Sequence, residues 1–130
     1  MIGIIDYNMG NLASVYNACK LIDADATIVK NPEDLKKFNR VILPGVGAYK
    51  DAMEHLIQTG MNEAVYEFAK TGKPMIGICL GMQLLFESSQ EFGHSDGLGL
   101  IDGHVIKSDK SKMHEDFKIP HMGWNTIKNK

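Results

Sequence analysis

The sequence predicts a single α/β domain built on an open parallel sheet with helices on both faces. Strands are expected where short apolar runs recur, at residues 1–5, 26–30, 40–43 and directly after Pro74. Segments with helical periodicity separate these runs, and such alternation favours a parallel sheet with right-handed crossovers. The first run is apolar throughout, as expected of a strand that is covered on both faces.

Composition agrees with one globular domain over residues 1–130. The chain is 44% hydrophobic and 23% charged, which provides enough apolar material for a core. Its 14 basic and 16 acidic residues balance without a long basic run, so binding to nucleic acid or to a membrane surface is not expected. A membrane span and a signal peptide are not expected either, which predicts a cytoplasmic protein. In that compartment a disulfide between Cys19 and Cys79 is not expected.

The first predicted helix covers residues 12–22, with Asn11 as its N-cap. Its apolar stripe consists of Leu12, Val15, Tyr16, Cys19 and Ile22. Residues 32–35 then form a short helical connection between the second and third strands, with Pro32 at its start.

Two further helices are expected at 51–57 and 61–70, separated by Thr59 and Gly60. Their core-facing residues are predicted from helical spacing to be Met53, Leu56, Ile57, Met61, Ala64, Val65 and Phe68. A fourth helix is expected over 80–87 and a polar loop over 88–97. Residues 98–107 alternate in polarity around a glycine, which predicts short antiparallel or edge strands.

Cys79 stands on the turn between the fourth strand and the helix predicted to follow it. Gly77 and Gly81 flank it two residues away on either side, the spacing of a nucleophile elbow that tolerates only small neighbours. The free N–H groups of the helix start favour a thiolate, and the N–H of Leu80 is directed at a developing oxyanion. The alternative is that Cys79 is a small buried hydrophobe at a strand end.

A second glycine-rich stretch follows the third strand, at the same predicted edge of the sheet. It reads Pro44-Gly45-Val46-Gly47, and two glycines permit a backbone path in which peptide N–H groups face an anion. Beside a cysteine elbow, Val46 or Gly47 becomes the natural second donor of an oxyanion hole. The choice between these two peptides stays open.

The remaining polar stretches have structural explanations on residue type alone. The loop 6–11 follows the first strand at the edge where α/β proteins bind ligands, although turn chemistry also accounts for its composition. The lone His121 and Trp124 usually indicate packing. No His/Cys/Asp/Glu set has metal-ligand spacing, and no phosphate-binding loop is present, so neither a metal nor a cofactor is expected.

The string Gly-Ile-Cys-Leu-Gly-Met-Gln at residues 77–83 resembles the active-site segment of class I, or triad, glutamine amidotransferases. These are flavodoxin-like α/β enzymes that hydrolyse glutamine to glutamate and ammonia, which is passed to a synthase. The resemblance implies that Cys79 forms a thioester and that Leu80, with Val46 or Gly47, binds the oxyanion. It also implies that Gly47 and Gln83 contact the substrate glutamine.

Residues 5–12 and the Pro-His-Met-Gly-Trp-Asn string at 120–125 resemble one branch of this family, the glutaminase subunits of imidazole glycerol phosphate synthases. This implies a heterodimer with a (β/α)8 cyclase subunit in histidine biosynthesis. The interface candidates are Asn8, Asn11, His121 and Trp124. Two alternatives stay open: a paralogue that feeds a sugar-modifying synthase, and a non-catalytic synthase-binding subunit. A cysteine hydrolase without a partner would leave the Pro-His-Met-Gly-Trp-Asn string at 120–125 unexplained.

One departure from the family concerns the base that the cysteine needs. The family keeps the His and Glu of its triad in a His-Pro-Glu-type segment near the end of a longer chain. The five histidines here are His55, His94, His104, His114 and His121, and only His121 adjoins a proline, on the wrong side. Two interpretations follow: the 130 residues are part of a larger protein, or the chain lacks full hydrolytic power.

Overall fold

The computed structural model describes residues 1–114 and 123–129. A four-stranded sheet lies at its centre, with every neighbouring pair parallel and the order β2-β1-β3-β4. This is the start of the flavodoxin-like 2-1-3-4-5 order, and it confirms the predicted parallel sheet. The strands are β1 (Ile2–Ile5), β2 (Ala26–Val29), β3 (Arg40–Leu43) and β4 (Met75–Gly77).

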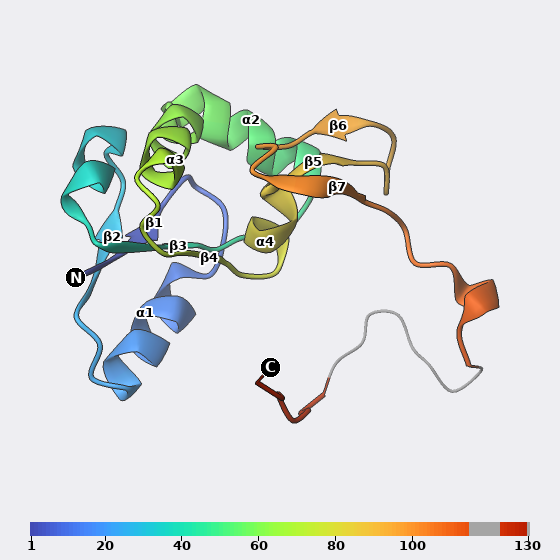
Figure 1. The fold of residues 1–130 in the computed structure, drawn as a ribbon, viewed down its shortest axis with the longest axis horizontal. Coiled ribbons are helices and arrows are strands. Elements are labelled where there is room, and N and C mark those ends of the chain that lie inside the picture. Colours follow the sequence, from blue (N-terminus) through green and yellow to red (C-terminus); the bar gives the residue numbers. More distant parts are fainter. Residues whose placement is uncertain (115–122, 130) are drawn as a thin grey trace.

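Helices cover both faces of this sheet, as predicted (Figure 1). One face packs against α2 (Tyr49–Thr59), α3 (Met61–Lys70) and the 3-10 helix η1 (Pro32–Lys37). The opposite side carries α1 (Leu12–Leu21). Asn11 caps α1 as expected, because its side-chain oxygen accepts a hydrogen bond from the Ser14 amide at 3.2 Å.

The two faces of the sheet are buried to different extents. On the α1 side, one register row consists of Ile4, Ile28, Ile42 and Ile76. Ile4 is fully buried, whereas Ile76, on the edge strand β4, is 56% exposed. On the opposite face, Leu43 and Val65 lie in the core formed with α2 and α3. Burial on this sheet therefore follows the helices that cover it and not residue type alone.

Two residues of the predicted core stripes are exposed in the structure. Ile22 is 75% exposed because α1 ends at Leu21, before the chain turns toward β2. Ile57 is 58% exposed because α2 buries a narrower stripe, and this position lies beyond its edge. The buried residues of α2 are Tyr49, Ala52, Met53 and Leu56.

The helix predicted over 80–87 is shorter than expected, and this prediction was wrong at its C-terminal end. Helix α4 spans Leu80–Leu84, and Phe86 already belongs to β5 (Phe86–Ser89). The carbonyl of Leu85 accepts hydrogen bonds from the amides of both Leu100 and Ile101, at 2.8 and 2.9 Å. Pairing with residues far along the chain therefore prevails over the helical periodicity of these positions.

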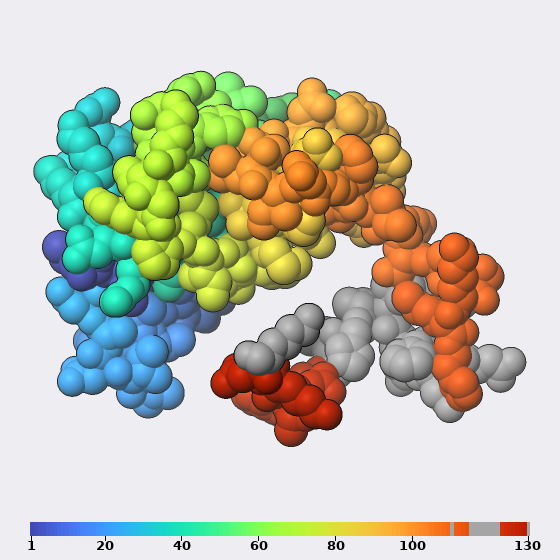
Figure 2. Space-filling model, in the orientation of Figure 1, coloured from blue at the N-terminus to red at the C-terminus, as the bar shows by residue number. Residues whose placement is uncertain are grey.

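Strand β5 belongs to a second, three-stranded sheet with the order β6-β5-β7. Its other strands are β6 (Ser95–Asp96) and β7 (Ile101–Val105). The predicted loop at 88–97 thus contains the end of β5 and all of β6, and β7 pairs with β5 in parallel whereas β6 pairs antiparallel. Figure 2 shows this small sheet, in yellow to orange, packed directly against the rest of the domain.

A short 3-10 helix, η2 (Lys110–Lys112), follows the small sheet. Within the residues that the structure describes, no helix combines the length and apolar character required to cross a membrane.

Candidate functional site

Cys79 lies between β4 and α4 in a backbone conformation that is rare for a residue with a side chain. Its φ is 54° and its ψ is −118°, and the residue is exposed. Positive φ brings Cβ close to the backbone, so such positions store strain and are found at turns that direct a functional side chain. The strained strand-to-helix turn predicted for Cys79 is therefore present, and the alternative of a buried Cys79 is wrong because the residue is exposed.

The two flanking glycines are required by close packing around this turn. A Cβ on Gly77 would lie 2.5 Å from the Cα of Met82, and a Cβ on Gly81 would overlap the carbonyl oxygen of Leu43. The amide of Ile78 donates to that same oxygen at 3.0 Å, which fixes the turn to the end of β3. The prediction that only small residues fit two positions before and after Cys79 is confirmed.

The segment 44–47, which follows β3, packs directly against this turn. A Cβ on Gly45 would lie 2.8 Å from the amide nitrogen of Gly81 and 3.1 Å from the Cβ of Leu80. Val46 is 53% exposed, and Gly47 has a φ of +105°, a conformation that favours glycine. The fold thus brings together the backbone around Cys79 and the segment expected to supply a second oxyanion donor.

Leu80 is the first residue of α4, and its side chain is buried. The amide groups in the first turn of an α-helix have no carbonyl partner within the helix. Gln83 is half-buried one turn later, and its backbone amide donates to the Cys79 carbonyl at 3.2 Å. Because α4 contains only 5 residues, its dipole is smaller than that of the longer helix predicted.

The loop after β1 packs against the other side of segment 44–47. The hydroxyl of Tyr7 donates a 2.7 Å hydrogen bond to the Pro44 carbonyl. A Cβ on Gly10 would lie 3.4 Å from the Gly45 amide nitrogen, and a Cβ on Gly47 would lie 3.1 Å from the Met9 methyl carbon. The sequence analysis did not identify Tyr7 as a site residue. The one feature that could have indicated it is a large aromatic residue within a turn.

The predicted interface residues have different positions in the structure. Asn8 is exposed with a φ of 69°, and its amide donates to the Asp6 carboxylate at 3.0 Å. Asn11 is exposed and caps α1. Trp124 is fully exposed, at 103% of its reference area, and His121 lies outside the described residues. The described residues contain no group of three or more His, Cys, Asp or Glu side chains able to hold a metal ion.

A family model described as glutamine amidotransferase class-I matches residues 3–129. The chain belongs to this family. Among its relatives are two proteins named imidazole glycerol phosphate synthase subunit HisH. The protein from Wolinella succinogenes is 62% identical over 125 residues, and the protein from Sulfurimonas denitrificans is 59% identical over 127 residues. The aligned regions cover 96% and 98% of this chain and 61% of each relative.

Solved structures confirm the amidotransferase fold of the chain. A protein described as a glutamine amidotransferase superposes with a TM-score of 0.68 at 20% identity, covering 79% of this chain and 54% of that protein. A putative peptidase E from Listeria monocytogenes superposes with a TM-score of 0.58 at 14% identity, over 77% of this chain and 62% of that protein. At these identities the likeness concerns the fold alone.

Proposed function

We propose that this amidotransferase chain carries the nucleophile of a glutaminase subunit of imidazole glycerol phosphate synthase. The single observation that carries the proposal is the strained, exposed Cys79, held by two obligatory glycines against segment 44–47. The identity of 62% to a protein named as a subunit of that synthase supports the histidine pathway over a sugar-modifying one.

In the proposed reaction, the Cys79 sulfur attacks the side-chain amide carbon of glutamine. The new C–S bond forms as the carbonyl π electrons move onto oxygen, and amides of Leu80 and of Val46 or Gly47 donate to that oxyanion. Collapse of the tetrahedral intermediate expels ammonia once the leaving nitrogen has been protonated. Water then cleaves the thioester and releases glutamate, while Gly47 and Gln83 hold the substrate.

Proton transfer in both steps requires a general base that also acts as an acid. By likeness to the family, we propose a histidine oriented by a glutamate in a His-Pro-Glu-type segment. The matched region spans 61% of the length of each of these two relatives.

The proposed acceptor of ammonia is a (β/α)8 cyclase subunit that forms imidazole glycerol phosphate and an aminoimidazole carboxamide ribotide in the cytoplasm. Trp124 supports an interface role because a fully exposed indole is a frequent anchor of protein interfaces. Asn8 and Asn11 are exposed on the loop and helix start after β1, and with His121 they complete the proposed contact set.

The experiment that tests this proposal measures covalent labelling of the protein made from its complete gene. An electrophilic glutamine analogue should add once, as seen by intact mass, and the Cys79→Ala variant should remain unlabelled and release no ammonia. Cys19→Ala is the matched control, because Cys19 is a buried cysteine of α1 at 6% exposure. This variant should label and hydrolyse glutamine as the parent protein does.

Each alternative function predicts a different result in the same experiment. Absence of an adduct at Cys79, together with retained affinity for a synthase, would indicate a non-catalytic binding subunit. Fast glutamine turnover that is indifferent to any synthase would indicate a hydrolase. Ammonia transfer to a sugar substrate, and not to the cyclase reaction, would indicate the paralogous pathway.

A further inference from the structure

The phenol of Tyr7 joins two loops at the edge of the sheet where Cys79 lies. Its side chain is fully buried, and its hydroxyl donates a 2.7 Å hydrogen bond to the carbonyl of Pro44, 37 residues further along the chain. Burial raises the pKa of the Tyr7 phenol above its ordinary value. The hydroxyl therefore stays protonated, and able to donate, throughout the physiological pH range.

The position of the hydroxyl determines where segment 44–47 can lie. A Cβ on Gly45 would lie 2.7 Å from the Tyr7 hydroxyl on one side and 2.8 Å from the Gly81 amide nitrogen on the other. Since the peptide unit is planar, holding the Pro44 carbonyl also fixes the orientation of the Gly45 amide. The backbone that leads to Val46 and Gly47 therefore starts from a Pro44–Gly45 peptide plane whose orientation is fixed.

We propose that Tyr7 is a positioning residue for the amide of Val46 or Gly47 that completes the oxyanion site with Leu80. This inference rests on the proposed glutaminase function. Tyr7 acts through the Pro44 carbonyl and does not contact the substrate. Its hydroxyl keeps segment 44–47 at the distance from the Cys79 turn that oxyanion binding requires.

A second buried tyrosine provides a matched control. Tyr49 lies two residues after segment 44–47, at the start of α2, and is 8% exposed. Within the described residues, its buried hydroxyl has no hydrogen-bond partner. Tyr49→Phe therefore removes the same atom from a similar environment without removing a bond to the segment.

The first measurement compares glutamine hydrolysis by Tyr7→Phe and Tyr49→Phe in the protein made from its complete gene, with its synthase bound. We expect kcat of Tyr7→Phe to fall about 10-fold, because outright loss of one oxyanion donor lowers kcat by roughly 100-fold or more. KM should change by less than about 2-fold, since ground-state binding is retained. Tyr49→Phe should keep both constants.

Alkylation of Cys79 by iodoacetamide separates positioning from general damage. Displacement of iodide at a saturated carbon forms no oxyanion, so Tyr7→Phe should react at the parental rate. An equal loss of alkylation and of turnover would overturn the inference, since it would indicate a disturbed thiol or elbow. Turnover at the parental rate would overturn it as well.

Amide hydrogen exchange tests the positioning directly and does not require turnover. We expect exchange of the Ile78 amide, which donates to the Leu43 carbonyl beside segment 44–47 at 3.0 Å, to accelerate by about 5-fold or more in Tyr7→Phe, because loss of the Tyr7 hydrogen bond favours local opening. Tyr49→Phe should exchange as the parent protein does. Unchanged exchange in Tyr7→Phe would overturn the inference, even for an active enzyme. A parent protein without glutaminase activity would instead refute the proposed function. Hydrogen exchange would still show whether Tyr7 holds segment 44–47 in position.

Discussion

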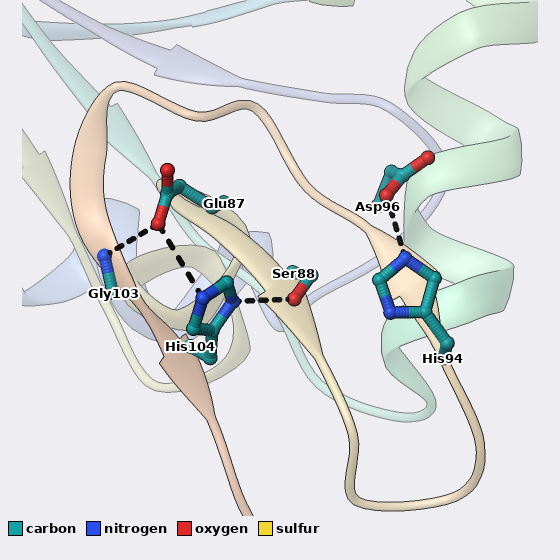
Figure 3. A network of polar contacts seen from close by, with 6 residues as sticks. All are labelled: Glu87, Ser88, His94, Asp96, Gly103 and His104. Carbon is teal, nitrogen blue, oxygen red and sulfur yellow. Dashed lines mark hydrogen bonds and ion pairs between the residues drawn. The ribbon is translucent and has the colours of Figure 1, made fainter.

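The Cys79 turn contrasts with a polar cluster on the small sheet that has the residue types of a catalytic triad. The ring of His104 lies between Ser88 and Glu87 (Figure 3). Its Nδ1 is 2.7 Å from the Ser88 hydroxyl, and its Nε2 is 3.6 Å from a Glu87 carboxylate oxygen. The same carboxylate oxygen accepts the Gly103 amide at 3.0 Å.

The two regions differ in the accessibility of the nucleophilic atom. Ser88 is only 2% exposed, and its hydroxyl is already bonded to His104, so a substrate cannot reach it. Cys79 is exposed and lies on a backbone with a positive φ of 54°. The comparison shows that a Ser-His-Glu set can fasten β5 to β7, whereas reactivity requires an accessible atom on a constrained backbone.

The largest expected effect comes from changing the constrained backbone itself. Gly81→Ala places a methyl group against the Leu43 carbonyl, and it should lower the free energy of unfolding by about 3 kcal/mol or more. Labelling of Cys79 by the glutamine analogue should be lost. Chemical denaturation and intact mass provide the two measurements.

Gly72→Ala is a control for that substitution, because it adds the same methyl group where there is room for it. Gly72 has a positive φ, of 72°, which Gly81 does not have, and a Cβ there would meet no atom within 4 Å. We expect a loss of about 1 kcal/mol from backbone strain, with labelling intact. Equal losses in the two variants would show that close packing does not explain the requirement at Gly81.

Ser88→Ala tests whether the cluster on the small sheet is structural. Removal of the hydroxyl should lower the free energy of unfolding by about 1 kcal/mol, since one hydrogen bond to His104 is lost. The rate of glutamine-analogue labelling should be unchanged. Ser89→Ala is the control: Ser89 is also buried, but among the described residues its hydroxyl accepts only a long 3.4 Å bond from the Glu91 amide. Slower labelling in Ser88→Ala would contradict the structural role.

Glu87→Gln should have the smallest effect. Both side chains of the His104–Glu87 pair are about half exposed, at 51% and 48%, and exposed pairs contribute at most about 1 kcal/mol. The amide oxygen of the new side chain can still accept the Gly103 amide. We expect a change of about 0.5 kcal/mol or less in the free energy of unfolding, smaller still in 1 M salt. A large loss that salt does not reduce would show that this carboxylate has a further partner.

Local patterns predicted much of the fold and the central part of the candidate site. The apolar runs located β1 and β3, and Asn11 located the start of α1. The glycine spacing around Cys79 predicted a strained turn, which the structure contains. These features could be recognised because backbone dihedral preferences, caps and periodicity are properties of a few neighbouring residues.

Contacts between distant residues decided the rest, and no pattern of neighbouring residues encodes them. Phe86 joins a strand because Ile101 pairs with it, although its own surroundings favour a helix. The bond from Tyr7 to Pro44 exists because parallel strands β1 and β3 end side by side. Likewise, Ser88 and Cys79 both carry a nucleophilic atom, although the sequence pattern marked only Cys79 as a candidate. Only the tertiary structure buries one and exposes the other, because burial depends on which elements pack together.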